Sequence, residues 1–373
     1  MGNQNYNKRH NSRMMKRHNA NREYDNFDNV FTYENLLASA FICKRNVNWK
    51  ASVQNFMREV YFNVYKIYNE LHKGTFKVKC TYEFDTYERG KRRHIRSIHI
   101  RERVVQRCLC DYCLLPILEK TFIYDNCASL KGKGLTFAIN RVVAHLQKHY
   151  RQYGTEGYVL LFDFSDFFGS IDHNMIMEQV KQYITDERLL HLIYTFIKMY
   201  KGDVGLGLGS QISQTLALLA VSPIDHLIKD KYQVKHYVRY MDDGMIIHND
   251  KAFLQFLLKE IEKKATQLGL TINKNKTRII KLNNGFTFIK KKISINDNGE
   301  INIRISRRSI TRMRRKLKAM KNFHDRGLAE LEDIETMYQS WRGLTLKHDS
   351  YNSVKSMDKL YNSLFPEVKD NEI

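Results

Sequence analysis

The sequence predicts an α+β protein, because apolar residues follow helical spacing in some segments and strand-like patterns in others. Helical spacing runs over 33–72 and again over 251–268. Strand-like segments occupy 75–87 and 92–100, and a further helix is expected at about 101–119. Such a mixture of helices and strands is typical of the α+β class.

The chain has 373 residues and a formal net charge of +22. Such an excess of positive charge indicates a polyanionic partner, either nucleic acid or a membrane surface. No stretch approaches about eighteen uninterrupted apolar residues, and no signal peptide is visible. We therefore expect a cytoplasmic protein that binds nucleic acid and has no membrane partner.

Six cysteines are present, and their arrangement does not suggest a secreted disulfide framework. Cys108, Cys110 and Cys113 lie together in a segment typical of an amphipathic helix. A zinc site there is conceivable, but no second Cys/His pair stands at ligand-like spacing. We expect these cysteines to pack in a core, in a reducing compartment.

The segment "VKHYVRYMDDGMIIHND" predicts a β-hairpin with two adjacent carboxylates at its tip. Apolar or aromatic residues alternate up to Tyr240, and an apolar run begins at Met245. Asp242 and Asp243 repel each other, so a fold that holds both on a tight turn usually has a cation to neutralise them. The competing interpretation is a surface hairpin with solvated aspartates.

A third carboxylate stands in a matching setting earlier in the chain. The apolar strand 159–162 ends directly before Asp163, and the Phe164 carbonyl follows. Three aspartates on neighbouring strand ends make a site for two Mg²⁺ ions, the usual device for in-line phosphoryl transfer, and Mn²⁺ could replace Mg²⁺. The sequence therefore predicts a metal site of Asp163, Asp242, Asp243 and the Phe164 carbonyl.

Tyr-x-Asp-Asp on a hairpin, preceded by a strand-end Asp in the context "FDFSDFF…IDH", resembles the palm of a reverse transcriptase. The order of the remaining motifs agrees over most of the chain. The resemblance implies a right-hand polymerase with fingers, a palm of antiparallel sheet plus helices, and a short helical thumb. The expected domains are a basic flexible arm (1–32), fingers (33–157), palm (158–290), and thumb with C-terminal helices (291–373).

The resemblance also implies roles for residues near the metal site. Phe168 matches the aromatic position that excludes a ribose 2′-hydroxyl, although an ordinary core Phe is the alternative. Lys276 resembles the lysine that donates a proton to the leaving pyrophosphate, with a surface lysine as the alternative. We expect Asp166 to lie one turn into a helix and Asp172 to cap the next helix.

Basic residues are expected to bind the triphosphate and the nucleic acid. Lys91 and Arg93 resemble the family's "GKxR" pair, and Arg103 resembles the Arg of its "RDRVVQ" segment. The loop "LKGKG" resembles a fingers loop that contacts template backbone, although Leu130 stands where many relatives carry Arg. The residues expected to contact nucleic acid are Lys131, Lys133, Tyr240, Arg308, Arg312 and Arg315.

The segment "GLGLGSQISQ" is expected to pass against the nascent base pair, with Gly209 and Gln214 at the nucleotide. It resembles reverse transcriptases of diversity-generating retroelements and some defence-associated enzymes, although the former usually have Pro where Gly207 stands. Leu208 replaces a Gln of other relatives, so we predict reduced fidelity. Residues 288–290 read Phe-Ile-Lys where the family's primer-gripping hairpin usually has Phe-Leu-Gly.

Together these features predict an RNA-directed DNA polymerase that copies a bound RNA template, expected to be non-coding, from a DNA primer and dNTPs. A protein partner or self-association remains open. The alternatives are an RNA-binding scaffold with a vestigial palm and a non-templated or protein-primed DNA polymerase. Resemblance allows two settings, an error-prone enzyme of a diversity-generating retroelement and anti-phage defence, and the departures at 207 and 288–290 favour defence.

Overall fold

The computed structural model describes residues 21–78, 81–88, 91–199, 202–207 and 209–366, with the backbone alone at 81, 88, 91, 93, 94 and 96. The protein consists of two compact units that interleave along the sequence. Unit 1 comprises Met1–Gly134, Asp163–Lys235 and Leu257–Asn273, and unit 2 comprises Leu135–Phe162, His236–Phe256 and Lys274–Ile373. Each unit combines helices with antiparallel strands, which confirms the α+β class. The division into fingers, palm and thumb stays a prediction.

From residue 21 onward, the described part of unit 1 first shows four helices, and the last three lie in the range 33–72 where helical spacing was expected. They are α2 (Phe27–Val30), α3 (Tyr33–Cys43), α4 (Ala51–Arg58) and α5 (Val60–His72). Asn26 and Thr32 cap α2 and α3, each accepting a hydrogen bond from a backbone N–H three residues later. The buried face of α5 is formed by Val60, Val64, Ile67 and Leu71.

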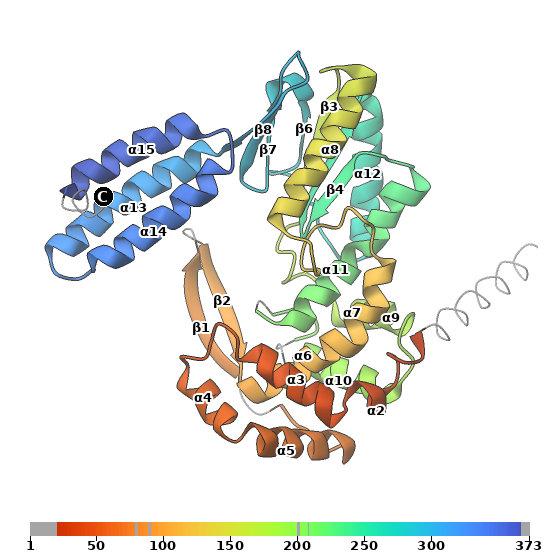
Figure 1. Ribbon diagram of the computed structural model, residues 1–373. Helices are drawn as coiled ribbons and strands as arrows, with labels where there is room; N and C mark the ends of the chain where they lie inside the picture. The colour runs from red at the N-terminus through yellow and green to blue at the C-terminus, as the bar shows by residue number, and fades with distance from the viewer. Residues whose placement is uncertain (1–20, 79–80, 89–90, 200–201, 208, 367–373) are drawn as a thin grey trace, which may run out of the picture. The chain divides into compact units, whose positions relative to one another are not determined.

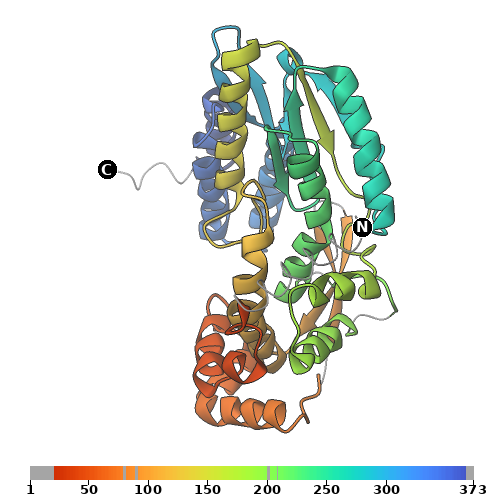
Figure 2. The ribbon, with the colours of Figure 1, turned by 90° about the vertical axis from the view of Figure 1, so that its right-hand side faces the viewer.

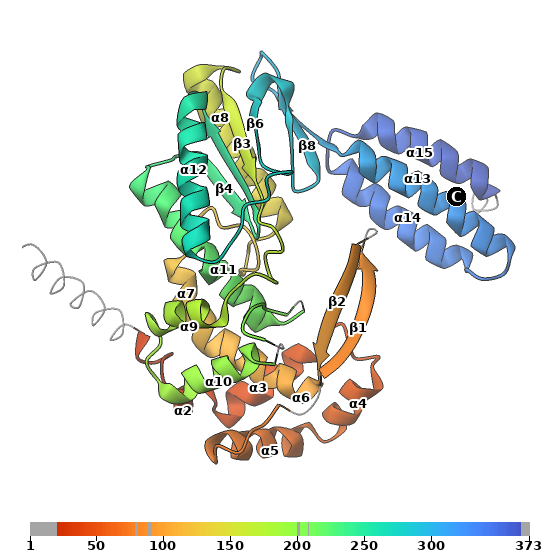
Figure 3. The ribbon, with the colours of Figure 1, turned by 180° about the vertical axis from the view of Figure 1, so that it is seen from behind.

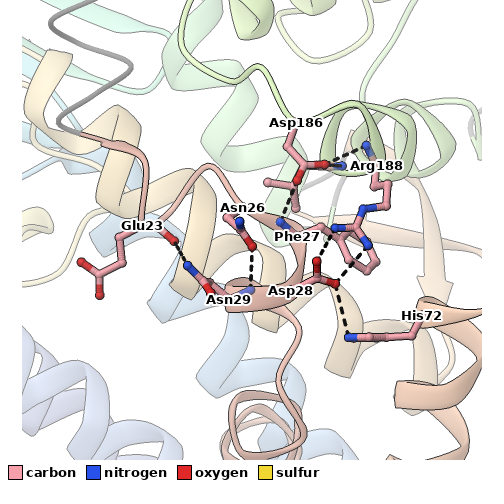
Figure 4. Close-up of polar contacts among 9 residues, drawn as sticks. Glu23, Asn26, Phe27, Asp28, Asn29, His72, Asp186 and Arg188 are labelled. Carbon is pink, nitrogen blue, oxygen red and sulfur yellow. Dashed lines mark hydrogen bonds and ion pairs between the residues drawn. The ribbon is translucent and has the colours of Figure 1, made fainter.

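The expected flexible arm is wrong for residues 21–32, which pack into unit 1 (Figure 4). Phe27 and Phe31 are buried. The Phe27 N–H donates to the Asp186 carboxylate at 2.8 Å, and Arg188 pairs with Asp28 at 2.6 Å. Hydrogen bonding from Arg188 lowers the pKa of Asp28. The segment is mostly polar on average, so its composition did not reveal that a few apolar residues would be buried. Residues 1–20 of the arm lie outside the described residues.

A nearly continuous helical stretch confirms the helix expected at about 101–119. It runs through α6 (Ile100–Leu109), the π-helical turn η1 (Cys110–Leu114), α7 (Leu115–Leu118) and the 3-10 turn η2 (Glu119–Thr121). Pro116 cannot donate a helical hydrogen bond, and a wider π-turn directly before it accommodates this loss. Cys108, Cys110 and Cys113 are buried free thiols, as the packing interpretation predicts.

The predicted strand-like segments form an antiparallel hairpin of unit 1, β1 (Thr81–Glu88) and β2 (Lys91–Ile98) (Figure 3). Three further helices and a π-turn belong to this unit, which also includes the part of a later helix from Leu257 onward. They are α9 (His173–Lys181), α10 (Glu187–Ile197), α11 (Gln211–His226) and η3 (Leu227–Lys231).

The sheet of unit 2 has the order β4-β5-β3-β6, and all its pairs are antiparallel. Its strands are β3 (Tyr158–Phe162), β4 (Tyr237–Tyr240), β5 (Asp243–His248) and β6 (Arg278–Lys281). Helix α8 (Leu135–Tyr153) packs along β4 and β5 (Figure 2). Helix α12 (Lys251–Gln267) follows β5, and the 3-10 turn η4 (Leu282–Asn284) follows β6.

A second sheet and a helical bundle follow in unit 2 (Figure 1). The sheet contains β7 (Phe286–Phe288), β8 (Lys291–Ile295) and β9 (Ile301–Ile305). The bundle contains α13 (Arg307–Asp325), α14 (Leu331–Leu346) and α15 (Tyr351–Leu364), packed around a core that includes Leu317 and Met357. The basic helix α13 begins at Arg307, because residues 301–305 pair with β8 and Ser306 caps the helix. Among the described residues, no helix is both long and apolar enough to cross a membrane.

Candidate active site

The predicted hairpin is present as β4 and β5, and its tip carries the two aspartates. Tyr240 pairs with Asp243, so Met241 and Asp242 form the two-residue loop. Met241 has a φ of 54°, and holding a non-glycine residue in this region costs about 1–3 kcal/mol. The Arg239 guanidinium, which is fully buried, donates to the Met241 carbonyl at 3.0 Å. A buried charge therefore braces the strained turn that presents the carboxylates.

Gly244 directly follows the two aspartates, and the ring of Phe162 covers it. A Cβ atom added at Gly244 would lie 2.2 Å from Phe162 Cζ. The Phe162 ring is itself buried and stacks on Tyr237, with 6.3 Å between ring centroids. Glycine is therefore required at this position of β5, because a side chain would displace the aromatic layer under the hairpin.

Asp163 is bonded to the last residue of β3, in agreement with the predicted strand end. β3 pairs with β5 in a register that runs from Tyr158↔His248 to Phe162↔Gly244. The Asp163 side chain is buried, and its Oδ1 accepts a hydrogen bond from Asn273 Nδ2 at 3.4 Å. The Asn273 backbone N–H donates to the Asp163 carbonyl at 2.7 Å. Asn273 is a residue of this site that sequence reasoning missed, because it lies in a loop with no motif of its own.

The chain after Asp163 is a turn, not the helix that we expected. Residues 165–170 form turns, and Asp166 has a φ of 42°, so its expected position inside a helix is wrong. Gly169 lies against Asp166, since a Cβ on Gly169 would meet the Asp166 carboxylate at 2.2 Å. Asp172 caps α9 as expected, by accepting from the Met175 N–H at 2.8 Å.

Phe168 is half-buried on this turn, edge-on to the Phe167 ring at 5.3 Å. Its backbone carbonyl accepts from the Leu206 N–H at 2.7 Å. This bond ties the turn to the glycine-rich segment, and the role of the Phe168 ring in sugar selection stays a prediction. Leu208 in the same segment lies outside the described residues.

The predicted nucleotide residues Gly209 and Gln214 flank the start of α11. Gly209 has a φ of 97°, and a Cβ there would lie 3.9 Å from a methyl group of Ile95 on β2. Gln214 Oε1 accepts from Ser129 Oγ at 3.4 Å. Sequence reasoning missed Ser210, which caps α11 and donates to the buried Gln106 side chain at 3.0 Å.

The expected triphosphate-binding cations lie on β2 and α6. The backbones of Lys91 and Arg93 pair with Glu88 and Thr86 across the hairpin, and their side chains lie outside the description. Arg103 is half-buried on α6.

The side chains expected to contact nucleic acid differ in their exposure and in their existing contacts. Lys131 is exposed, whereas Lys133 donates to the Tyr124 carbonyl at 2.9 Å and lies over the Tyr124 ring. Tyr240 is half-buried at the end of β4, and Lys276, the expected proton donor to the leaving pyrophosphate, is exposed on the turn before β6. Three exposed arginines lie along α13: Arg308, Arg312 and Arg315.

The donor set fits Mg²⁺ chemically, because carboxylate and carbonyl oxygens are the ligands that this ion prefers. Within the described residues, no group of three or more His, Cys, Asp or Glu side chains already stands arranged around a metal position. Magnesium sites of polymerases commonly use one or two carboxylates and complete their coordination with substrate phosphates and water. A preformed protein cage is therefore not required for this assignment.

Residues 84–302 match the family described as reverse transcriptase (RNA-dependent DNA polymerase). The chain belongs to this family. Among curated proteins, this chain is similar to protein YkfC of Escherichia coli, with 25% identity over 54% of this chain and 62% of that protein. It is also similar to the putative COX1/OXI3 intron 1 protein of Saccharomyces cerevisiae, with 22% identity over 60% of this chain and 33% of that protein. This chain thus spans less than two thirds of either relative.

Among solved structures, the chain matches telomerase of Candida albicans in complex with a fragment of telomeric RNA, with a TM-score of 0.47 and 12% identity. That match covers 76% of this chain and 55% of the telomerase chain. Apo telomerase of Candida tropicalis matches with a TM-score of 0.45 and 13% identity, over 64% of this chain and 53% of that one.

Proposed function

We propose that this protein is an RNA-directed DNA polymerase that extends a DNA primer by two-metal-ion nucleotidyl transfer. The observation that carries the proposal is the β3–β5 pairing beneath the Asp242–Asp243 turn. Phe162 pairs with Gly244, and Asp163 and Asp243 are the next residues of the two chain segments. Membership of the reverse transcriptase family supports the same chemistry.

Asp163, Asp242, Asp243 and the Phe164 carbonyl would hold the metal ions in this proposal. Two Mg²⁺ ions, when bound, lower the pKa of the primer 3′-hydroxyl and neutralise the triphosphate. Asn273 would orient the Asp163 carboxylate through its amide. The strained Met241 turn and the buried Arg239 would keep the other two carboxylates in a fixed direction before substrate arrives.

The cationic residues would then bind the triphosphate and protonate the pyrophosphate that leaves it. Arg103, with Lys91 and Arg93, would bind phosphate oxygens, since guanidinium forks match them bidentately. Lys276 would supply a proton to the departing pyrophosphate. Lys131, Lys133 and the arginines of α13 would contact the template–primer backbone, with Tyr240 at the primer end.

Selection of deoxynucleotides is assigned to Phe168. Its ring is only half-buried, and its carbonyl is bonded to the glycine-rich segment that includes Gly209. A bulky ring at this position would exclude a ribose 2′-hydroxyl by steric contact. Gly209 and Gln214 would adjoin the same nucleotide.

The test is metal-dependent dNTP incorporation on an RNA template annealed to a DNA primer. Asp242→Asn keeps the size of the side chain and removes its charge, so we expect incorporation to fall by orders of magnitude, at least about 10²-fold. Asp297→Asn removes an exposed carboxylate from the β8–β9 turn of the same unit and serves as the matched control. Full activity of Asp242→Asn would rule out the assigned site.

The biological setting that we propose is anti-phage defence with a bound non-coding RNA. Gly207 in place of Pro and Phe-Ile-Lys at 288–290 support this setting over a diversity-generating retroelement. Phage plating on cells that carry the gene with its flanking DNA, compared with Asp242→Asn, tests it. Sequencing of the copurified RNA and cDNA gives the second readout. Copies of a neighbouring repeat would indicate the retroelement, and product from single dNTPs without RNA would indicate a non-templated polymerase.

A further inference from the structure

Helix α5 of unit 1 exposes three aromatic side chains on the face opposite its core. Tyr61, Phe62 and Tyr65 are 64%, 53% and 53% exposed. Residues 61, 62, 65 and 66 share one face of the helix, because 61 and 65, and 62 and 66, are four positions apart and 62 and 65 are three positions apart. A single exposed aromatic side chain is common on protein surfaces, but three on two adjacent turns are not explained by packing.

The same face carries a lysine. Lys66 is exposed, and its Nζ lies 4.1 Å from the centroid of the Phe62 ring. Residues 44–73 contain six Lys and Arg residues and two Glu residues. One of these acids, Glu70, is engaged by the Arg101 guanidinium, which leaves Glu59 as the exposed acid of the segment. The segment that contains this face is therefore predominantly basic, which is complementary to a polyanion.

We propose that the exposed face of α5, formed by Tyr61, Phe62, Tyr65 and Lys66, binds single-stranded RNA by stacking bases on its aromatic rings. Rings at positions i and i+4 of a helix have Cβ atoms about 5–6 Å apart, so they can contact successive unpaired bases. Lys66 meets the phosphate backbone beside them. A protein interface is disfavoured, because lysine is depleted from the centres of such interfaces, whereas stacking with cations is the usual mode for single strands.

This inference deepens the proposed function, since it assigns a holding surface for the RNA partner of the polymerase. The stacking is indifferent to base identity, because every base has a π-face. The surface is therefore suited to an unpaired segment of template or non-coding RNA, and it does not select a sequence. RNA binding can be measured without polymerisation, which separates the two claims.

The experiment measures anisotropy of a fluorescein-labelled single-stranded oligouridine, about ten nucleotides long, with the full chain. Phe62→Ala and Tyr65→Ala are each expected to weaken binding about tenfold or more, the effect of losing one base–aromatic stack. Phe62→Tyr and Tyr65→Phe keep the rings and should bind as the unchanged protein does. Lys66→Gln should lower the slope of log K against log salt by about 0.7, the value for one phosphate contact on a single strand.

A matched control exists on α10 of the same unit. Tyr194 is 39% exposed and lies under Lys198 at i+4, at 5.6 Å, but Lys198 is engaged by Asp203. Tyr194→Ala therefore removes a similar aromatic–lysine pair whose lysine is already engaged by a carboxylate, and it should leave RNA affinity unchanged.

Unchanged RNA affinity in Phe62→Ala and Tyr65→Ala would overturn the inference, even if dNTP incorporation proceeds. A change in sedimentation of these variants without a change in RNA affinity would overturn it too, and would identify an interface between copies. Weakened RNA binding in Phe62→Ala and Tyr65→Ala, together with no dNTP incorporation by the wild-type protein, would support the surface and count against the polymerase.

Discussion

Substitution of Gly244 by alanine tests the packing that supports the aspartate hairpin. The added Cβ would stand 2.2, 2.5 and 2.6 Å from three carbons of the Phe162 ring, where ordinary carbon contacts are about 3.5–4 Å. The ring must therefore move by more than about 1 Å. It has little space to do so, because it is buried and stacks on the buried Tyr237.

Overpacking of a core usually costs about 1–3 kcal/mol, and this crowded position should reach the upper end of that range. Asp163 and Asp243 are the chain neighbours of the two residues that collide. Since a misplacement of about 1 Å can cost about 10²-fold in rate, incorporation should fall more than global stability suggests. Urea unfolding followed by circular dichroism, hydrogen exchange of β3 and β5, and dNTP incorporation are the assays.

Two further variants separate the collision with Phe162 from the general effect of replacing a glycine. Gly343→Ala lies on an exposed turn of α14 with nothing within 4 Å of the new Cβ, so it should stabilise the protein by about 0.5–1 kcal/mol. Gly244→Ala with Phe162→Leu should regain part of the lost stability, with a coupling energy of about 0.5–3 kcal/mol. Unfolding of Gly244→Ala like wild type would show that the collision with Phe162 is not what makes glycine necessary. The same would follow if the losses in unfolding free energy of Gly244→Ala and Phe162→Leu simply add in the double variant.

Three other expectations concern strain, protonation and sugar selection. Ile289 and Lys290 close the β7–β8 hairpin with φ values of 40° and 67°, so Lys290→Gly should raise the free energy of unfolding by about 1 kcal/mol; no gain in urea midpoint would show that the turn is not strained. Burial lowers the pKa of His149, so its contribution to stability is complete above about pH 6.5 and is lost as pH falls below that value. His149→Gln should flatten the dependence of the urea midpoint on pH between 5 and 7, within the limit of about 1.4 kcal/mol per pH unit for one proton, and an unaltered profile would exclude His149 as the titrating group. Phe168→Ala should increase ribonucleotide incorporation relative to dNTP incorporation, and equal discrimination would remove Phe168 from sugar selection.

Local patterns in the sequence were sufficient for the hairpin and its neighbouring strand. Alternation of apolar residues around Tyr240, and the apolar strand that ends before Asp163, depend only on residues close in sequence. The structure shows both elements, with β4 and β5 closing on the predicted pair and β3 ending at residue 162. Capping of α9 by Asp172 was equally accessible, because a cap contacts its own first turn.

Contacts between distant segments could not be predicted from such local patterns. Residues 21–32 resemble a solvated tail in composition, yet Phe27 and Asp28 meet residues about 160 positions away. Strand β9 was not predicted, because its pairing with β8 is not visible in the local pattern. Asn273 has no motif and matters only through its bonds to Asp163.

The amino-acid sequence decided which acidic residues stand at strand ends and turns, since these positions follow from periodicity over a few residues. Tertiary structure alone decided how they are supported: a buried Arg239 under the turn, the Phe162 ring over Gly244, and the Asn273 amide on Asp163. Each of these supports joins groups through strand register or side-chain packing. Register and packing are properties of the assembled chain, because a shift of one residue would turn every side chain of a strand to the other face.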